Sequence, residues 1–110
     1  MAFDEVLADR VRDVAASVSG EGLAEKRMFG GIGFLLSGNM ATGVHGDDLI
    51  VRCAKDEHEA FLAEPGARPF DLSGRPMAGW LMVAGDVLDD DVLRTWVSRG
   101  VAFAATLPPK

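Results

Sequence analysis

The sequence contains a single cysteine, Cys53, and few basic residues. One cysteine excludes an intramolecular disulfide and a metal site built from several cysteines. Only 11 lysines and arginines stand against 17 aspartates and glutamates, which gives a formal net charge of −6. Because phosphate neutralisation supplies much of the affinity of nucleic-acid binders, we expect the isolated chain to bind nucleic acid weakly if at all.

Long apolar runs are also missing. No stretch approaches the roughly 20 apolar residues that span a bilayer, so we expect no membrane partner. The first five residues have neither the basic nor the apolar segment of a secretion signal, which predicts a cytoplasmic protein. No internal repeat, low-complexity tract or linker divides the 110 residues, so we expect one domain spanning residues 1–110.

Motifs for catalysis and for cofactor binding are incomplete. The glycines of segment 30–33 lack the last glycine of the dinucleotide fingerprint, whose position is Leu36, and more strand follows instead of a helix. His45 and His58 do not have a zinc-ligand spacing. No serine stands in a G-x-S-x-G or S-x-x-K frame. We therefore expect no catalytic site, no cofactor and no bound metal, and we expect the chain not to be an enzyme.

Amphipathic helices are predicted at both ends of the chain. Apolar residues recur at helical spacing from Phe3 to Val18, acidic residues occupy the first turn, and Gly20 is placed to end the helix. A second helix is predicted to open at residues 89–91 and to continue to Leu107.

The middle of the chain predicts strands separated by tight turns. The expected strands are residues 26–36, 40–45, 49–53 and 79–84, with a bulge or a close backbone approach at glycines 30–33. A short helix is expected over residues 56–64, with Asp56 and Glu59 as its capping pattern. Grouped strands favour an α+β fold with an antiparallel sheet. Cys53 alternates with Leu49 and Val51, which predicts a small buried side chain.

Cations and large apolar residues of the middle region are the candidate interaction residues. The cations either converge as a basic patch or are scattered and solvated: Lys26, Arg27, Arg52, Lys55, Arg68 and Arg75. Four apolar residues either anchor a partner or belong to the core: Phe34, Met40, Trp80 and Met82.

Several segments of this middle region resemble the amino-terminal domain of the TfoX/Sxy family. They are Lys26–Phe34, Asp47–Arg52, Arg68–Phe70 and Gly74–Met77 together with Trp80. The resemblance implies a five-stranded antiparallel sheet flanked by helices, in the order α-βββ-α-ββ-α, similar to the secretion-chaperone-like fold. It also implies a relation to positive regulators of natural competence, which act on transcription of DNA-uptake genes. Those regulators carry a further carboxy-terminal helical domain, and we expect this chain to be a stand-alone amino-terminal domain.

These observations predict a non-enzymatic regulatory or adaptor domain. We expect it to act by binding another protein or by self-association as a homodimer. The candidate interaction patch is Lys26, Arg27, Arg52, Arg75 and Trp80. Two alternatives remain: a nucleic-acid-binding module that uses a central basic patch, and a domain that binds a small molecule.

Overall fold

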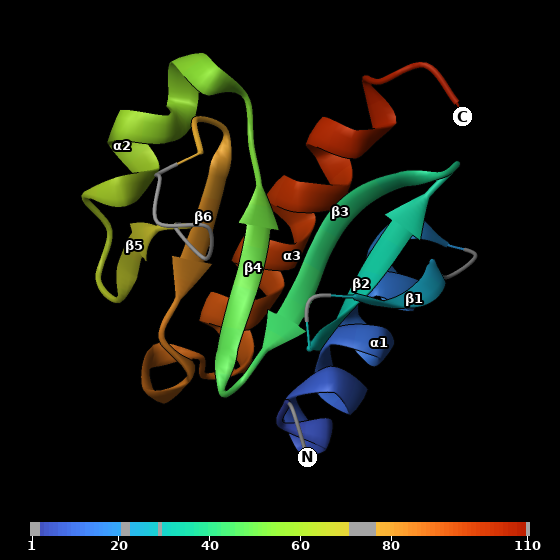
Figure 1. The fold of residues 1–110 in the computed structure, drawn as a ribbon, viewed down its shortest axis with the longest axis horizontal. Helices are drawn as coiled ribbons and strands as arrows, with labels where there is room; N and C mark the ends of the chain where they lie inside the picture. The colour runs from blue at the N-terminus through green and yellow to red at the C-terminus, as the bar shows by residue number, and fades with distance from the viewer. Residues whose placement is uncertain (1–2, 21–22, 29, 71–76, 110) are drawn as a thin grey trace.

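The computed structural model describes residues 3–20, 23–28, 30–70 and 77–109, which form an α+β domain. One antiparallel sheet has the strand order β1-β2-β3-β4-β6-β5, and α1 and α3 lie behind it on one side (Figure 1). The elements are α1 (Glu5–Ser19), β1 (Ala24–Met28), β2 (Gly31–Leu36), β3 (Asn39–His45), β4 (Asp48–Arg52), η1 (Lys55–Glu57), α2 (His58–Leu62), β5 (Ala67–Pro69), β6 (Trp80–Val83), η2 (Gly85–Val87) and α3 (Asp90–Ala105). The predicted fold class is confirmed, with six strands in place of about five.

Acidic residues begin both long helices, as the sequence predicts, and the structure shows one of them as the cap of each helix. The Asp4 side chain accepts hydrogen bonds from the backbone N–H groups two and three residues later, at 2.9 and 3.1 Å. Asp89 accepts one from Val92 at 2.8 Å and caps α3 in the same way. Gly20 closes α1 with a left-handed φ of 81°. Helix α3 ends at Ala105, two residues before the predicted end.

The short middle helix differs from its prediction at the start. It opens as the 3₁₀ turn η1 and continues as α2, and neither element has a side-chain hydrogen bond at its N-cap. The expected cap by Asp56 is therefore wrong. Tertiary contacts fix this helix, because Phe61 packs edge-on against Trp96 of α3 with ring centres 5.7 Å apart.

The predicted strand 26–36 is in fact two strands. Met28 pairs with Gly31, so the chain reverses between them, and Gly30 has a φ of 74°. The expected close backbone approach is confirmed at Gly31, where a Cβ would lie 2.2 Å from the Val44 carbonyl oxygen. The bulge lies further along, between Phe34 and Leu35 in the β2–β3 ladder. Alternation of side chains alone does not distinguish one bulged strand from a hairpin.

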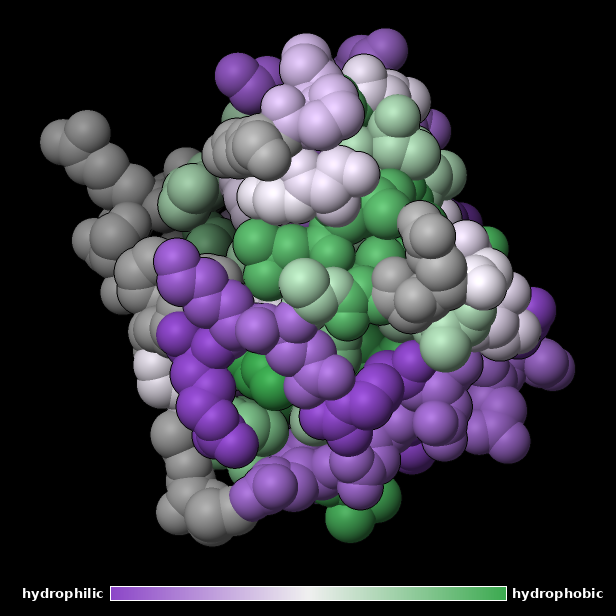
Figure 2. Space-filling view, turned by 90° about the vertical axis from the view of Figure 1, so that its right-hand side faces the viewer, coloured by the Kyte–Doolittle hydropathy of each residue, from purple (hydrophilic) through white to green (hydrophobic). Residues whose placement is uncertain are grey.

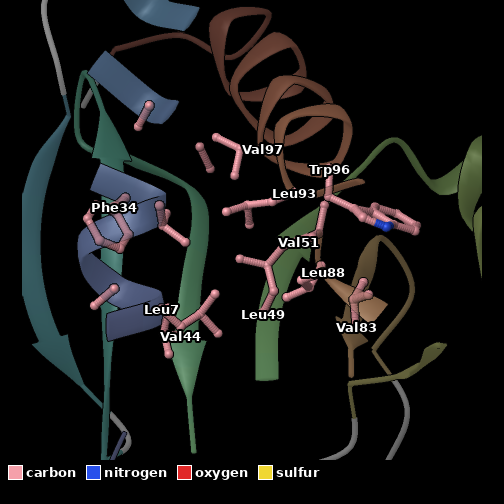
Figure 3. Close-up of a cluster of buried hydrophobic side chains, with 14 of the residues drawn as sticks. Leu7, Phe34, Val44, Leu49, Val51, Val83, Leu88, Leu93, Trp96 and Val97 are labelled. Atoms are coloured by element: carbon pink, nitrogen blue, oxygen red, sulfur yellow. The ribbon is translucent and has the colours of Figure 1, made fainter. Parts of the chain in front are cut away.

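Helices α1 and α3 lie on the same face of the sheet, and the main core fills the space between them and the strands (Figures 1 and 3). Side chains from both layers point into this space, among them Phe34, Val51 and Trp96 (Figure 3). Cys53 belongs to this core and is 2% exposed, which confirms its prediction as a buried apolar residue. Desolvation by burial raises the pKa of its thiol, and nearby Glu57 raises it further.

Helix α3 sits unusually close to the sheet because its inner face contains Gly100. A Cβ on Gly100 would lie 2.3 Å from the Ala41 carbonyl oxygen of β3, which is far inside van der Waals contact. The absence of a side chain therefore sets how closely α3 packs on β3. Among the described helices, none is long and apolar enough to cross a membrane.

Candidate interaction surface

A second, smaller apolar cluster occupies the sheet face that α1 and α3 leave uncovered, which we call the helix-free face. Strand residues alternate between faces, so Ile50 and Met82 point away from the helices. They lie opposite each other across the β4–β6 ladder and are 5% and 3% exposed. Phe70 is buried with them, and Met40 and Trp80 pack against them while remaining partly exposed. This face is thus built around a small apolar centre.

Trp80 and Met40 are the apolar side chains of this cluster that partly reach solvent. The Trp80 ring lies 5.9 Å from the ring of Phe70, so packing fixes its position. Met82 lies on the same face but is buried. Phe34 is 1% exposed in the main core and points to the helices. Of the four predicted anchors, Trp80 and Met40 therefore remain candidates for contact with a partner.

Arg52 links the helix-free face to helix α3. The β3–β4 ladder ends at the pair Thr42 and Val51, one residue before Arg52, and β3 curves away from β4 toward its first residues (Figure 1). The Arg52 guanidinium lies 5.0 Å from the centre of the Trp80 ring and 5.5 Å from that of Phe103. Its Nη1 also donates a 3.4 Å hydrogen bond to the Met40 carbonyl oxygen. Arg52 therefore connects β4 to the start of β3 where the ladder has ended, and it fixes Trp80 by stacking.

The other predicted patch residues do not all join this pair. Lys26 and Arg27 lie on β1, three interstrand spacings from β4, which is about 14 Å. The row of paired residues that begins at Lys26 runs across the central glycines of β2 and β3 to Ile50. Residues paired in such a row point to the same side of the sheet, so Lys26 lies on the helix-free face. Arg27 points to the opposite face. Arg75 lies outside the described residues, so the patch as a whole stays a prediction.

Cations outnumber acids on the described strands of the helix-free face. Lys26, Arg52 and Arg68 point to this side, and Asp48 is the acid among the described strand residues that does so. Arg68 forms an ion pair with Asp48. The described strand residues of this face therefore differ in charge from the chain as a whole, whose net charge is −6.

A polar groove separates β1 from α1 on the helix side of the sheet. The groove has a volume of about 170 Å³, and Arg27 lies above the Phe3 ring at 5.2 Å from its centre. The Arg12 guanidinium of α1 donates two hydrogen bonds to the Glu25 carboxylate in a bidentate contact, at 2.6 and 2.7 Å. This hydrogen-bonded contact lowers the pKa of Glu25 despite partial desolvation, and Arg27 contributes a smaller electrostatic effect. Glu25 therefore remains ionised at neutral pH.

His58 ties the start of β6 to the start of α2. Its Nδ1 accepts a 2.7 Å hydrogen bond from the backbone N–H of Gly79, in a buried position. The Gly79 carbonyl oxygen accepts a 2.8 Å hydrogen bond from the Cys53 N–H, just after β4. Gly79 precedes Trp80, so these two contacts help to place the Trp80 side chain. The structure shows His58 as a buried packing residue.

A second hollow, of about 400 Å³, lies between the start of α1, the β3–β4 turn and η2. Four aspartates line it, but Asp4 caps α1 and Asp48 pairs with Arg68. Over the described part of the chain, no three His, Cys, Asp or Glu side chains gather closely enough to hold a metal ion. Two of the four aspartates that line the hollow are thus already used in the fold.

Sequence reasoning missed two aromatic residues of the surface. Phe103 borders the buried stripe of α3, three residues after Gly100, and helical spacing alone does not show that it meets a strand residue. Phe70 follows the three-residue strand β5, which gives too short a pattern to assign its face. Both contacts arise from tertiary packing.

Comparison with known families identifies residues 17–104 as a TfoX N-terminal domain. The matched segment includes β1, β4, β6 and most of α3, and so contains the helix-free face. No curated protein and no solved structure matches the chain. The family match covers most of the 110 residues and agrees with the resemblance seen in the sequence. The chain belongs to the TfoX N-terminal domain family.

Proposed function

We propose that this chain is a non-enzymatic regulatory or adaptor domain that binds another protein through the helix-free face. The observation that carries the proposal is the fixed, partly exposed Trp80 ring, held between Arg52 and Phe70 at 5.0 and 5.9 Å. A rigid aromatic side chain next to an arginine is the composition typical of binding hot spots. Membership of the TfoX N-terminal domain family supports a role like that of the competence regulators.

The charge of the helix-free face indicates the chemistry of the partner. Arg52 stacks on Trp80 at the apolar centre, Arg68 lies opposite Met82 on the neighbouring strand, and Lys26 lies on the same face three strands from β4. A partner segment with an apolar side chain and a nearby carboxylate matches this arrangement, because the apolar group packs on Trp80 and the carboxylate meets the cations. The partner is thus expected to present an acidic, apolar segment.

Nucleic-acid binding is the competing function that the same cations raise. It requires several cations to contact phosphates together, but Lys26 and Arg52 lie on strands about 14 Å apart, and the net charge of the chain is −6. Arg52 is also held by two aromatic rings. We therefore expect weak binding of duplex DNA, at or beyond dissociation constants of about 10⁻⁴ M at physiological salt. A fluorescence titration at several salt concentrations measures it.

The test of the proposal is capture of a partner from the native host, followed by measurement with the purified partner. The bait variants are Trp80→Ser and, as a matched control, Val6→Ser, which removes an apolar side chain that is 69% exposed on α1. The proposed contact predicts at least a tenfold loss of affinity for Trp80→Ser, about 1.4 kcal/mol, and none for Val6→Ser. Equal binding by both variants contradicts the proposal, as does submicromolar, salt-sensitive DNA binding that collapses with Arg52→Glu.

A further inference from the structure

The two edges of the sheet differ in their capacity to pair with another strand. Strand β5 forms one edge, has three residues and ends in Pro69, which has no N–H to donate. Strand β1 forms the other edge, with five residues and no proline, and β2 is its neighbour in the sheet. An edge of this kind presents a row of backbone groups to an incoming strand. Figure 2 shows this side of the molecule, where hydrophilic side chains gather below an apolar area.

The β1–β2 ladder determines which backbone groups of β1 face outward. Two positions separate Met28 from Gly31, and a two-residue loop is closed by a hydrogen-bonded pair. Hydrogen-bonded and non-hydrogen-bonded pairs alternate along an antiparallel ladder. The N–H and C=O groups of Met28, Lys26 and Ala24 therefore turn toward β2. Those of Glu25 and Arg27 turn outward, away from the sheet.

The outward groups restrict how two copies of β1 can pair about a twofold axis. Glu25 or Arg27 of one copy must lie opposite Glu25 or Arg27 of the other. Glu25 opposite Glu25 brings two negative charges together, and Arg27 opposite Arg27 brings two positive charges together. The remaining register, centred on Lys26, places Glu25 opposite Arg27 at two equivalent positions. This register satisfies the outward backbone groups and pairs the opposite charges of Glu25 and Arg27 at the same time.

We propose that a second copy of this chain pairs with β1 in this antiparallel register, which joins the two sheets into one. Four backbone hydrogen bonds form between Glu25 and Arg27 of the two copies, and each Glu25 carboxylate meets an Arg27 guanidinium. Glu25 stays ionised for this contact because Arg12 lowers its pKa. Arg27 is exposed, and the 170 Å³ groove beside it leaves room on the helix side of β1.

The same register makes the pairing weak and reversible. Lys26 of one copy faces Lys26 of the other on the helix-free side, and like charges directly opposite each other are unfavourable. A five-residue edge also buries less area than the roughly 1,200–2,000 Å² of standard interfaces. We therefore expect a concentration-dependent equilibrium between monomer and dimer. Replacing Lys26 with Thr removes the repulsion and strengthens the dimer several-fold.

Charge reversal tests the register with variants of the full chain. In Arg27→Glu both contacts become acid against acid, and in Glu25→Arg both become base against base, so each variant alone is expected to lose at least tenfold in dimer affinity. In an equimolar mixture, every contact again joins opposite charges. Sedimentation velocity over a concentration series is therefore expected to show dimers of the wild type and of the mixture, and monomers of each single variant.

Matched controls separate this effect from net charge. Arg94→Glu and Glu59→Arg make the same changes in charge at exposed positions away from β1. Both are expected to dimerise like the wild type. A wild-type chain that stays monomeric up to millimolar concentration overturns the proposal, and so does an Arg27→Glu variant that dimerises normally. Failure of the mixture to restore dimers, with both variants folded by circular dichroism, also overturns it.

Discussion

The two faces of the sheet use the same strands in different ways. On the helix side, α1 and α3 cover a continuous core, and Gly100 lets α3 approach β3 closely. On the helix-free side, a small cluster surrounds Ile50 and Met82, and cations border it. Neighbouring residues on one strand therefore lie in different environments. The comparison indicates that stability resides mainly on the helix side, while the other face retains side chains for contact.

The largest expected difference between the faces is in the unfolding free energy lost on truncation, and it is expected within β6, at Leu81 and Met82. Leu81 is fully buried in the main core, whereas Met82 is 3% exposed in the small cluster. Truncation of such residues to Ala costs about 2–5 kcal/mol of unfolding free energy. We expect Leu81→Ala to cost about 4 kcal/mol and Met82→Ala about 2 kcal/mol, because fewer buried neighbours surround Met82. Urea unfolding measures both, and a larger loss for Met82→Ala would reverse the comparison.

The sequence predicted the features that have a local signal and not those that depend on tertiary packing. Helical spacing and acidic residues at the helix starts predicted α1 and α3 because those signals are local, and short strand-like runs next to turn segments predicted β3, β4 and β6. The hairpin between β1 and β2 was not predicted, since a glycine turn and a glycine bulge look alike in sequence. Cys53 was placed correctly because one alternating strand determines its face. The contact of Arg52 with Phe103 was not, because it joins residues 51 positions apart through tertiary packing.

His58 provides the second prediction, because it fixes the backbone just before Trp80. Replacing His58 with Ala leaves the buried Gly79 N–H without its acceptor and costs about 2 kcal/mol of unfolding free energy. His58→Asn places an oxygen near the Nδ1 position and is expected to recover part of this loss. Thermal unfolding measures stability, and near-ultraviolet circular dichroism reports on the Trp80 environment. Equal stability of the Ala and Asn variants would show that the hydrogen bond contributes little.

Arg52 provides the third prediction, because it connects the two sides of the sheet at its end. Arg52→Met keeps an apolar stem but removes the charge that lies near the Trp80 and Phe103 rings, and we expect a loss of about 1 kcal/mol. Arg52→Lys retains the charge without the planar stack and is expected to fall between. In a Trp96→Phe background, Trp80 is the remaining tryptophan. Quenching of its fluorescence by a soluble quencher is expected to increase in Arg52→Met. Unchanged quenching would indicate that Arg52 does not hold Trp80.

The smallest expected effect separates the neighbours Glu25 and Lys26, which point to opposite faces of β1. Glu25 contacts Arg12, and its lowered pKa means that it stabilises the fold above its unfolded-state pKa and loses this contribution as the pH falls through the lower folded-state value. Because the pair is partly exposed, we expect Glu25→Gln to cost less than about 1 kcal/mol at pH 7. The difference from wild type is expected to shrink below about pH 4. Lys26→Gln, measured at the same low protein concentration to keep the chain monomeric, is expected to leave stability within about 0.5 kcal/mol. A pH-independent difference for Glu25→Gln would show that the lost contribution is packing and not charge.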